Sequence, residues 1–132
     1  MTTIKEDYVS FETAKLLKEK GFNAEIDTYY SPEGKFKIWC PNGLKSYLDN
    51  KGTETWWWKC IAPTLQMAIK WLREVHKISI EITSTGYLID NDVEWECDIK
   101  VGLRLYFKHI TNEKSFESCA NKALEYCLEY LI

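Results

Sequence analysis

The sequence contains no run of apolar residues that approaches the roughly eighteen needed to cross a membrane, and the segment from Met1 to Asp7 is polar and acidic. We therefore expect a protein that is neither exported nor anchored in a membrane. Its five cysteines are odd in number and show no C-x-x-C spacing, which argues against a disulfide framework. Reduced cysteines of this kind are typical of the cytoplasm, and we expect a cytoplasmic location.

The sequence also lacks the short motifs that mark common enzymes and cofactor sites. There is no Walker loop, no G-x-G-x-x-G segment, no zinc-ligand spacing and no serine nucleophile elbow. The histidines His76 and His109 stand at a helix end and after a strand, and they belong to no ligand pattern. Cys97, Cys119 and Cys127 occupy apolar positions, where thiols usually behave as small hydrophobic groups. We expect no catalytic residue, no metal and no cofactor, with cysteine nucleophile chemistry as a minor alternative.

Charge is too evenly spread to suggest a nucleic-acid or lipid surface. The 17 basic and 20 acidic residues give a net charge of -3 and are interspersed along the chain. On the first predicted helix Lys15, Lys18 and Lys20 fall close together, but Glu12 and Glu19 interrupt them. A solvated helix face is therefore the favoured interpretation, and we do not expect nucleic acid as a partner.

The most regular feature present is an alternation of apolar and polar residues. It runs without a break from Val93 to Lys108 and predicts antiparallel or edge strand with one dry face. The residues expected to be buried are Val93, Trp95, Cys97, Ile99, Leu103 and Leu105. Those expected to be exposed are Glu94, Glu96, Asp98 and Arg104.

This alternation is too long for one ordinary strand. If straight it would extend about 53 Å, whereas strands rarely exceed about ten residues. Gly102 is the expected place for a change of direction, either as a bulge in one long strand or in the loop of a hairpin. The sequence is compatible with both.

Three amphipathic segments predict helices near residues 11 to 20, 63 to 76 and 116 to 131. Ser10 and Ser115 are the expected N-caps of the first and third helices, and Pro63 suits the first position of the second. Gly21 followed by apolar Phe22 is typical of a Schellman stop at the end of the first helix.

Two further strands are predicted between the first two helices, one over residues 22–30 and one from Phe36 to Cys40. In both, the even-numbered residues are expected to face inward. The connection should then hold an odd number of residues, such as five with Tyr30 opposite Phe36, or include a bulge. All these elements together predict one domain, residues 1–132, of class α+β, with a mainly antiparallel sheet of about five strands and three helices packed on one face.

Three segments resemble small proteins from phage, prophage and mobile-element regions of gut anaerobes. They run from Tyr8 to Phe22, from Ala62 to His76 and from Ser115 to Leu128, and all are predicted helices with their flanks. The resemblance implies a genomic setting and a size class. That family has no known activity, so the resemblance implies no functional residues.

Trp56, Trp57 and Trp58 form the first candidate binding site. In an extended chain successive side chains point to opposite faces, so the three indoles cannot all share one face. One interpretation is a recognition surface for a sugar ring, a base or a partner's side chain. The alternative, which we favour, is that the segment crosses between the sheet and the second helix and buries indoles on both sides.

The second candidate is the polar face of the long alternation, which carries Glu94, Glu96, Asp98, Lys100, Arg104 and Lys108. Carboxylates in a row can bind a metal or perform acid and base chemistry. Same-face neighbours on one strand lie roughly 7 Å apart and point in parallel, however, so a convergent site needs ligands from another strand. A solvated face with charges paired across strands is the favoured interpretation.

The C-terminal residues Tyr130 and Ile132 end the last helix without a polar cap. Apolar surface of this kind needs cover, which a homodimer would provide. We expect a non-enzymatic binding or accessory protein of a phage or mobile element that acts by protein–protein contact. The residues expected to bind the partner are Trp56, Trp57, Trp58, Tyr130 and Ile132. The alternatives are a nucleic-acid or small-ligand binding module that uses the Trp56–Trp58 segment, and an enzyme of unrecognised type.

Overall fold

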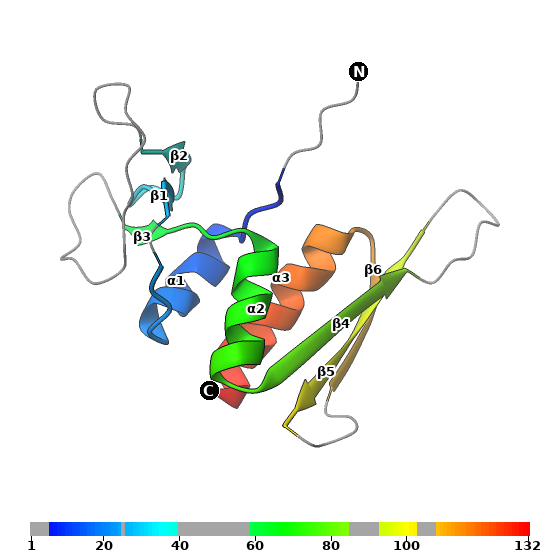
Figure 1. Ribbon diagram of the computed structural model, residues 1–132. Coiled ribbons are helices and arrows are strands. Elements are labelled where there is room, and N and C mark those ends of the chain that lie inside the picture. The colour runs from blue at the N-terminus through cyan, green and yellow to red at the C-terminus, as the bar shows by residue number, and fades with distance from the viewer. Residues whose placement is uncertain (1–5, 25, 40–58, 85–92, 103–107) are drawn as a thin grey trace. The chain divides into compact units, whose positions relative to one another are not determined.

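The computed structural model describes residues 6–24, 26–39, 59–84, 93–102 and 108–132. The chain falls into two units, residues 1–64 and 65–132, and its class is α+β, as predicted. The described residues form three α-helices and two three-stranded antiparallel sheets (Figure 1). This corrects the expected single sheet of about five strands. Each sheet forms within one unit, and local periodicity does not encode which distant strands pair. The expectation of a single domain stays a prediction.

Helix α1 (Phe11–Glu19) has the ends that the sequence predicts. The Ser10 side chain accepts a hydrogen bond from the Thr13 amide at 3.2 Å, which caps the first turn. At the other end Gly21 has a φ of +90°. The Phe22 amide donates to the Leu17 carbonyl at 2.9 Å, which completes a Schellman motif and buries the Phe22 ring.

The first sheet has the strand order β2-β1-β3, with β1 (Thr28–Tyr30) between β2 (Phe36–Ile38) and β3 (Cys60–Ile61). Tyr30 lies opposite Phe36 across a five-residue connection, which is one of the arrangements that the parity of the two strands allowed. The strands are shorter than expected, and the predicted inward face of β2 is wrong. Phe36 is 41% exposed and Ile38 is 62% exposed, because β2 lies at an edge of the sheet.

Helices α2 (Leu65–Val75) and α3 (Phe116–Tyr126) lie close to their predicted positions, and α3 continues as a π-helical turn, η2 (Cys127–Leu131). Ser115 caps α3, as predicted. Pro63 does not begin α2. Its carbonyl accepts from the Val9 amide and Thr64 bridges Tyr8, which keeps this segment extended. Among the described residues, no helix has both the length and the apolar character needed to cross a membrane.

The second sheet resolves the two alternatives for the long alternation. Its order is β4 (Ile78–Ser84), β5 (Trp95–Val101), β6 (Lys108–Glu113), and β5 pairs with β6 in antiparallel fashion. Gly102, with a φ of +58°, follows β5 directly, and its amide donates to the Lys77 carbonyl at 2.8 Å. The chain therefore forms a hairpin after Gly102.

The predicted burial of β5 is confirmed at its centre and wrong at its start. Cys97 and Ile99 are at most 1% exposed, and they face α3, whereas Val93 and Trp95 are half-buried. Three acidic residues that were expected to be exposed are also half-buried, namely Glu94, Glu96 and Asp98. His109 lies over Glu96 and Asp98, and Lys114 lies over Glu94. Leu103, Leu105 and Arg104 lie outside the described residues.

Helices α2 and α3 both contact the second sheet on its apolar face (Figure 1). The core of this unit is built from side chains that are fully buried, among them Leu72, Ile99, Ala123, Leu124 and Leu128. In a core packed this closely, truncation of a large side chain removes its packing contacts and leaves a cavity that the neighbouring side chains fill only in part, so truncation is costly.

Replacement of Ile99 by alanine should therefore lower the free energy of unfolding by about 2–5 kcal/mol. The matched control is Val75→Ala, because Val75 is also β-branched and lies in the same unit but is 58% exposed. That substitution should change stability by less than about 0.5 kcal/mol. Chemical denaturation followed by circular dichroism measures both, and equal losses would contradict the assignment of Ile99 to the core.

Candidate functional site

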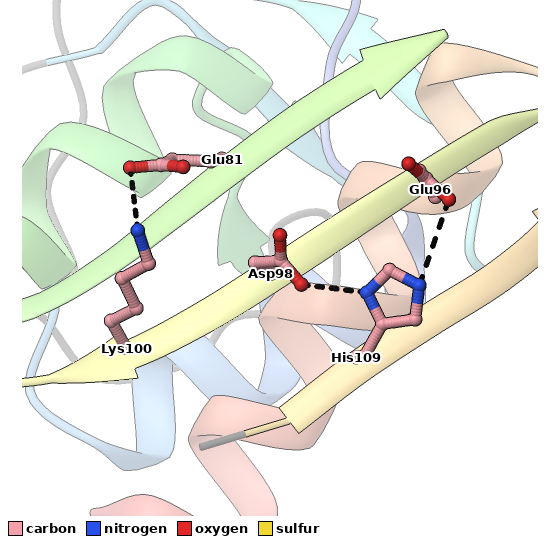
Figure 2. Close-up of polar contacts among 5 residues, drawn as sticks. All are labelled: Glu81, Glu96, Asp98, Lys100 and His109. Carbon is pink, nitrogen blue, oxygen red and sulfur yellow. Dashed lines mark hydrogen bonds and ion pairs between the residues drawn. The ribbon is translucent and has the colours of Figure 1, made fainter. Parts of the chain in front are cut away.

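The polar face of the second sheet gathers five charged or ionisable side chains. Figure 2 shows Glu81 on β4, His109 on β6, and the three side chains Glu96, Asp98 and Lys100 on β5. They share a face because side chains alternate along each strand and because the register places Asp98 opposite both Glu81 and His109.

His109 is held between two carboxylates. Its Nδ1 donates to Oδ1 of Asp98 at 2.6 Å, and its Nε2 lies 3.6 Å from Oε2 of Glu96. The first contact is a short hydrogen bond, whereas the second is within ion-pair distance but too long for a hydrogen bond. All three side chains are between a third and a half exposed.

This arrangement contains part of a catalytic constellation. A histidine oriented by an aspartate is the base of a Ser-His-Asp triad, but its other nitrogen must face a nucleophile. Here Nε2 faces Glu96, and Cys97, the thiol between the two acidic residues in sequence, is buried on the opposite face. The geometry therefore favours a structural cross-strand contact over nucleophilic catalysis.

The other charges on this face are also paired. Lys100 Nζ lies 3.2 Å from Oε1 of Glu81, and Lys114 Nζ lies 3.2 Å from Oε1 of Glu94. These pairs agree with the interpretation favoured from the sequence, in which the charges of this face pair across strands. Within the described ranges, no group of three or more His, Cys, Asp or Glu side chains is placed to hold a metal ion. In Figure 2 the two carboxylates bind different edges of the imidazole and do not converge.

His109 was missed as part of this cluster at the level of sequence, where it was placed after a strand. It lies inside β6, opposite Asp98. The signal that identifies it is the register of the β5–β6 hairpin, which the alternation alone does not contain.

The cysteines of the described residues are buried and poorly suited to nucleophilic chemistry. Burial raises the pKa of both Cys97 and Cys127 to about 12, and it also raises the pKa of Cys119. Thiols with such pKa values stay protonated at neutral pH, and the thiolate is the nucleophile. Cys60 is likewise buried, whereas Cys40 lies outside the described residues.

Of the residues predicted to bind a partner, two fall within the described part of the chain. Tyr130 is 70% exposed, and its ring lies 5.2 Å from that of Tyr126, while Ile132 is half-buried. Lys108 Nζ lies 5.4 Å from the Tyr126 ring centroid and extends this aromatic surface. Trp56, Trp57 and Trp58 lie outside the described residues, so their role stays a prediction.

A second exposed apolar surface, which the sequence did not predict, lies on the first sheet. Phe36 and Ile38 project from β2 on one side of the strand, and the Tyr8 ring centroid lies 4.7 Å from that of Phe36. We call Tyr8, Phe36 and Ile38 the β2 surface. The sequence contained a signal for it, namely a short run with apolar residues at alternate positions, but did not show that these positions face solvent.

Two hollows border α2, but few polar side chains in their linings point toward a common centre. One, of about 430 Å³, is lined by Lys77 and Ser79, and the other, of about 210 Å³, by Gln66; Arg73 borders both. The Lys77 ammonium is already engaged by the Glu74 carbonyl at 3.0 Å. A small-ligand site needs several polar groups aimed at one point, which these hollows do not supply among the described residues.

Comparison with protein-family models, with curated proteins and with solved structures finds no match to this chain.

One buried carboxylate makes the stability of the second unit depend on pH. Glu113, 6% exposed at the end of β6, accepts hydrogen bonds from Lys122 Nζ and, at 2.7 Å, from the Ser118 hydroxyl. The bond from Lys122 is the main reason that the pKa of Glu113 lies below its ordinary value of 4.5, and it outweighs burial. A lowered pKa in the folded state stabilises the fold above pH 4.5, and this stabilisation is lost as the pH falls further.

Glu113→Gln should therefore be less stable than the natural protein at pH 7, and the difference should shrink as the pH is lowered from about 5 toward 3. Denaturation curves of both proteins across this range test it. Glu117→Gln is a suitable control, because Glu117 is exposed on α3. A difference that is constant or grows on acidification would show that Glu113 does not act through its charge.

Proposed function

We propose that this protein is a non-enzymatic binding or accessory protein that acts by contact with another protein, and that the β2 surface makes this contact. The observation that carries the proposal is the exposure of Phe36 and Ile38, 41% and 62%, on a strand at the edge of its sheet. Exposed apolar groups that lie together mark interaction sites more often than single exposed residues do.

The contrast with the second sheet supports this choice. Natural proteins protect edge strands with charges, bulges and irregular backbone. Strand β6 is protected in this way, since Thr111 and Asn112 are exposed, Asn112 has a φ of +62°, and the register shifts between Trp95 and Cys97 on its neighbour. Strand β2 carries one exposed charge, Lys37, but its two flanking positions present large apolar side chains, Phe36 and Ile38.

A non-enzymatic role is supported by the chemistry of the groups that are suited to catalysis. The carboxylates near His109 are engaged in cross-strand contacts, and the thiols of Cys97 and Cys127 have raised pKa values. The setting that we propose, in the cytoplasm and in a phage or mobile element, rests on the cysteine usage and on the resemblance of the helical segments.

Ile38→Thr should strongly reduce capture of the partner, because it removes the apolar contact while keeping a β-branched residue in the strand. The matched control is Val75→Thr, which changes another exposed β-branched aliphatic residue, 58% exposed on α2. The measurement is affinity capture from the native host, quantified by mass spectrometry, with and without nuclease treatment. We expect one or more proteins to be retained by the natural chain and by Val75→Thr but reduced at least about tenfold by Ile38→Thr.

Two results would contradict the proposal. One is capture of the same proteins, in equal amounts, by all three chains. The other is capture that nuclease treatment removes, which would favour the nucleic-acid binding module instead. A light-scattering measurement on the same chains shows whether the captured protein is a second copy, which is the homodimer that the sequence suggested.

A further inference from the structure

We propose that the β2 edge binds its partner by β-strand addition, and that the added strand is an extended segment with acidic residues alternating with apolar ones. This inference rests on the proposed function and specifies the chemistry of the partner. It is carried by the direction of the backbone groups of β2, by the side chains on its two faces, and by the charge of Lys37.

The hydrogen bonds of β1 determine where the backbone groups of β2 point. The carbonyls of Thr28 and Tyr30 accept from the amides of Ala62 and Lys59, both at 2.9 Å, so both carbonyls point toward β3. In an antiparallel pair, facing residues either exchange hydrogen bonds with each other or both point away. The partners of Thr28 and Tyr30 on β2 therefore direct their backbone groups away from β1.

Those partners are Ile38 and Phe36. Bonds at the flanking positions agree with this assignment, since the Trp39 amide donates to the Asp27 carbonyl at 2.6 Å and the Ser31 amide donates to the Lys35 carbonyl at 3.0 Å. Within the part of the chain that the structure describes, no strand pairs with β2 on its outer side. Phe36 and Ile38 thus present their N–H and C=O groups to an added strand, as strand-addition sites do.

The side chains of β2 divide into an apolar face and a basic face. Phe36 and Ile38 project to one side, the exposed Lys37 lies between them on the other side, and the exposed Lys35 directly precedes the strand. Neither ammonium group makes an ion pair with a described residue. An added strand that matches both faces carries apolar side chains at alternate positions and carboxylates between them.

The charge of Lys37 argues against a second copy of β2 as the occupant. In the antiparallel register that uses the open backbone groups of both Phe36 and Ile38, each Phe36 faces the Ile38 of the other copy. Lys37 then faces Lys37, and like charges directly opposite each other on neighbouring strands destabilise the pairing. A carboxylate at that position reverses the sign of the interaction.

The test uses the full chain and three short blocked peptides. One alternates valine with glutamate, one alternates valine with lysine, and one is the glutamate peptide with a central proline that cannot extend a sheet. We expect the glutamate peptide to bind, the lysine peptide to bind roughly tenfold more weakly, and the proline peptide not to bind. Binding is measured by fluorescence polarisation of labelled peptides.

Two variants separate strand addition from a general apolar or ionic contact. Lys37→Glu should reverse the preference, so that the lysine peptide binds more tightly than the glutamate peptide. Ile38→Pro removes an outward N–H that takes no part in the β1–β2 pairing and should weaken the glutamate peptide at least about tenfold. The Lys37→Glu result keeps the test decisive if Ile38→Pro does not fold.

Several results would overturn the inference. These are equal binding of the glutamate and lysine peptides, an unchanged preference in Lys37→Glu, and a dimer that the peptide dissociates in light scattering, which would assign the edge to a second copy. The proposed function fails separately. If the Ile38→Thr variant no longer captures the protein but no peptide binds to the natural chain, the β2 surface is still the contact site and strand addition is wrong. If the Ile38→Thr variant captures the same proteins as the natural chain, the function assigned to the β2 surface is wrong.

Discussion

In an antiparallel sheet each strand alternates in two ways, since successive side chains point to opposite faces and successive backbone groups point to opposite neighbours. Both units of this protein depend on this constraint. In the second sheet it places Cys97 and Ile99 in the core and sets Asp98 beside His109 on the polar face. In the first sheet it directs the backbone groups of Phe36 and Ile38 away from β1, to a side on which no described strand pairs with them.

Among the described residues, most groups that could carry chemistry are engaged within the fold, the exception being the buried Nε2 of His76, which has no hydrogen-bond partner, whereas the β2 surface is exposed. His109 pairs with Glu96 and Asp98, Lys100 pairs with Glu81, and the four thiols of the described residues lie in the core. Glu113 is satisfied by Lys122 and Ser118. At β2, by contrast, apolar side chains and unpaired backbone groups occur on the same residues, in the part of the chain that the structure describes. A surface of that kind fits binding better than catalysis.

Features set by neighbouring residues could be predicted from the sequence. Ser10 and Ser115 identified two helix starts, and parity predicted an odd-length connection, of which five residues with Tyr30 opposite Phe36 was one option. Features set by long-range strand pairing could not be predicted, because the periodicity of a sequence does not show which strands are neighbours in a sheet. For that reason the two sheets were expected to be one, and His109 was missed. The exposure of Phe36 and Ile38 breaks the rule that apolar residues face inward, and such departures are expected at functional sites.

The most direct test of this account is amide hydrogen exchange along β2 in the full chain without any ligand. Exchange is slow where an amide is held by a hydrogen bond and fast where it faces solvent. The account predicts fast exchange at Phe36 and Ile38 and slow exchange at Lys37, which pairs with Tyr29. Slow exchange at all three residues would show that the edge is already covered, and would contradict its assignment as the binding surface.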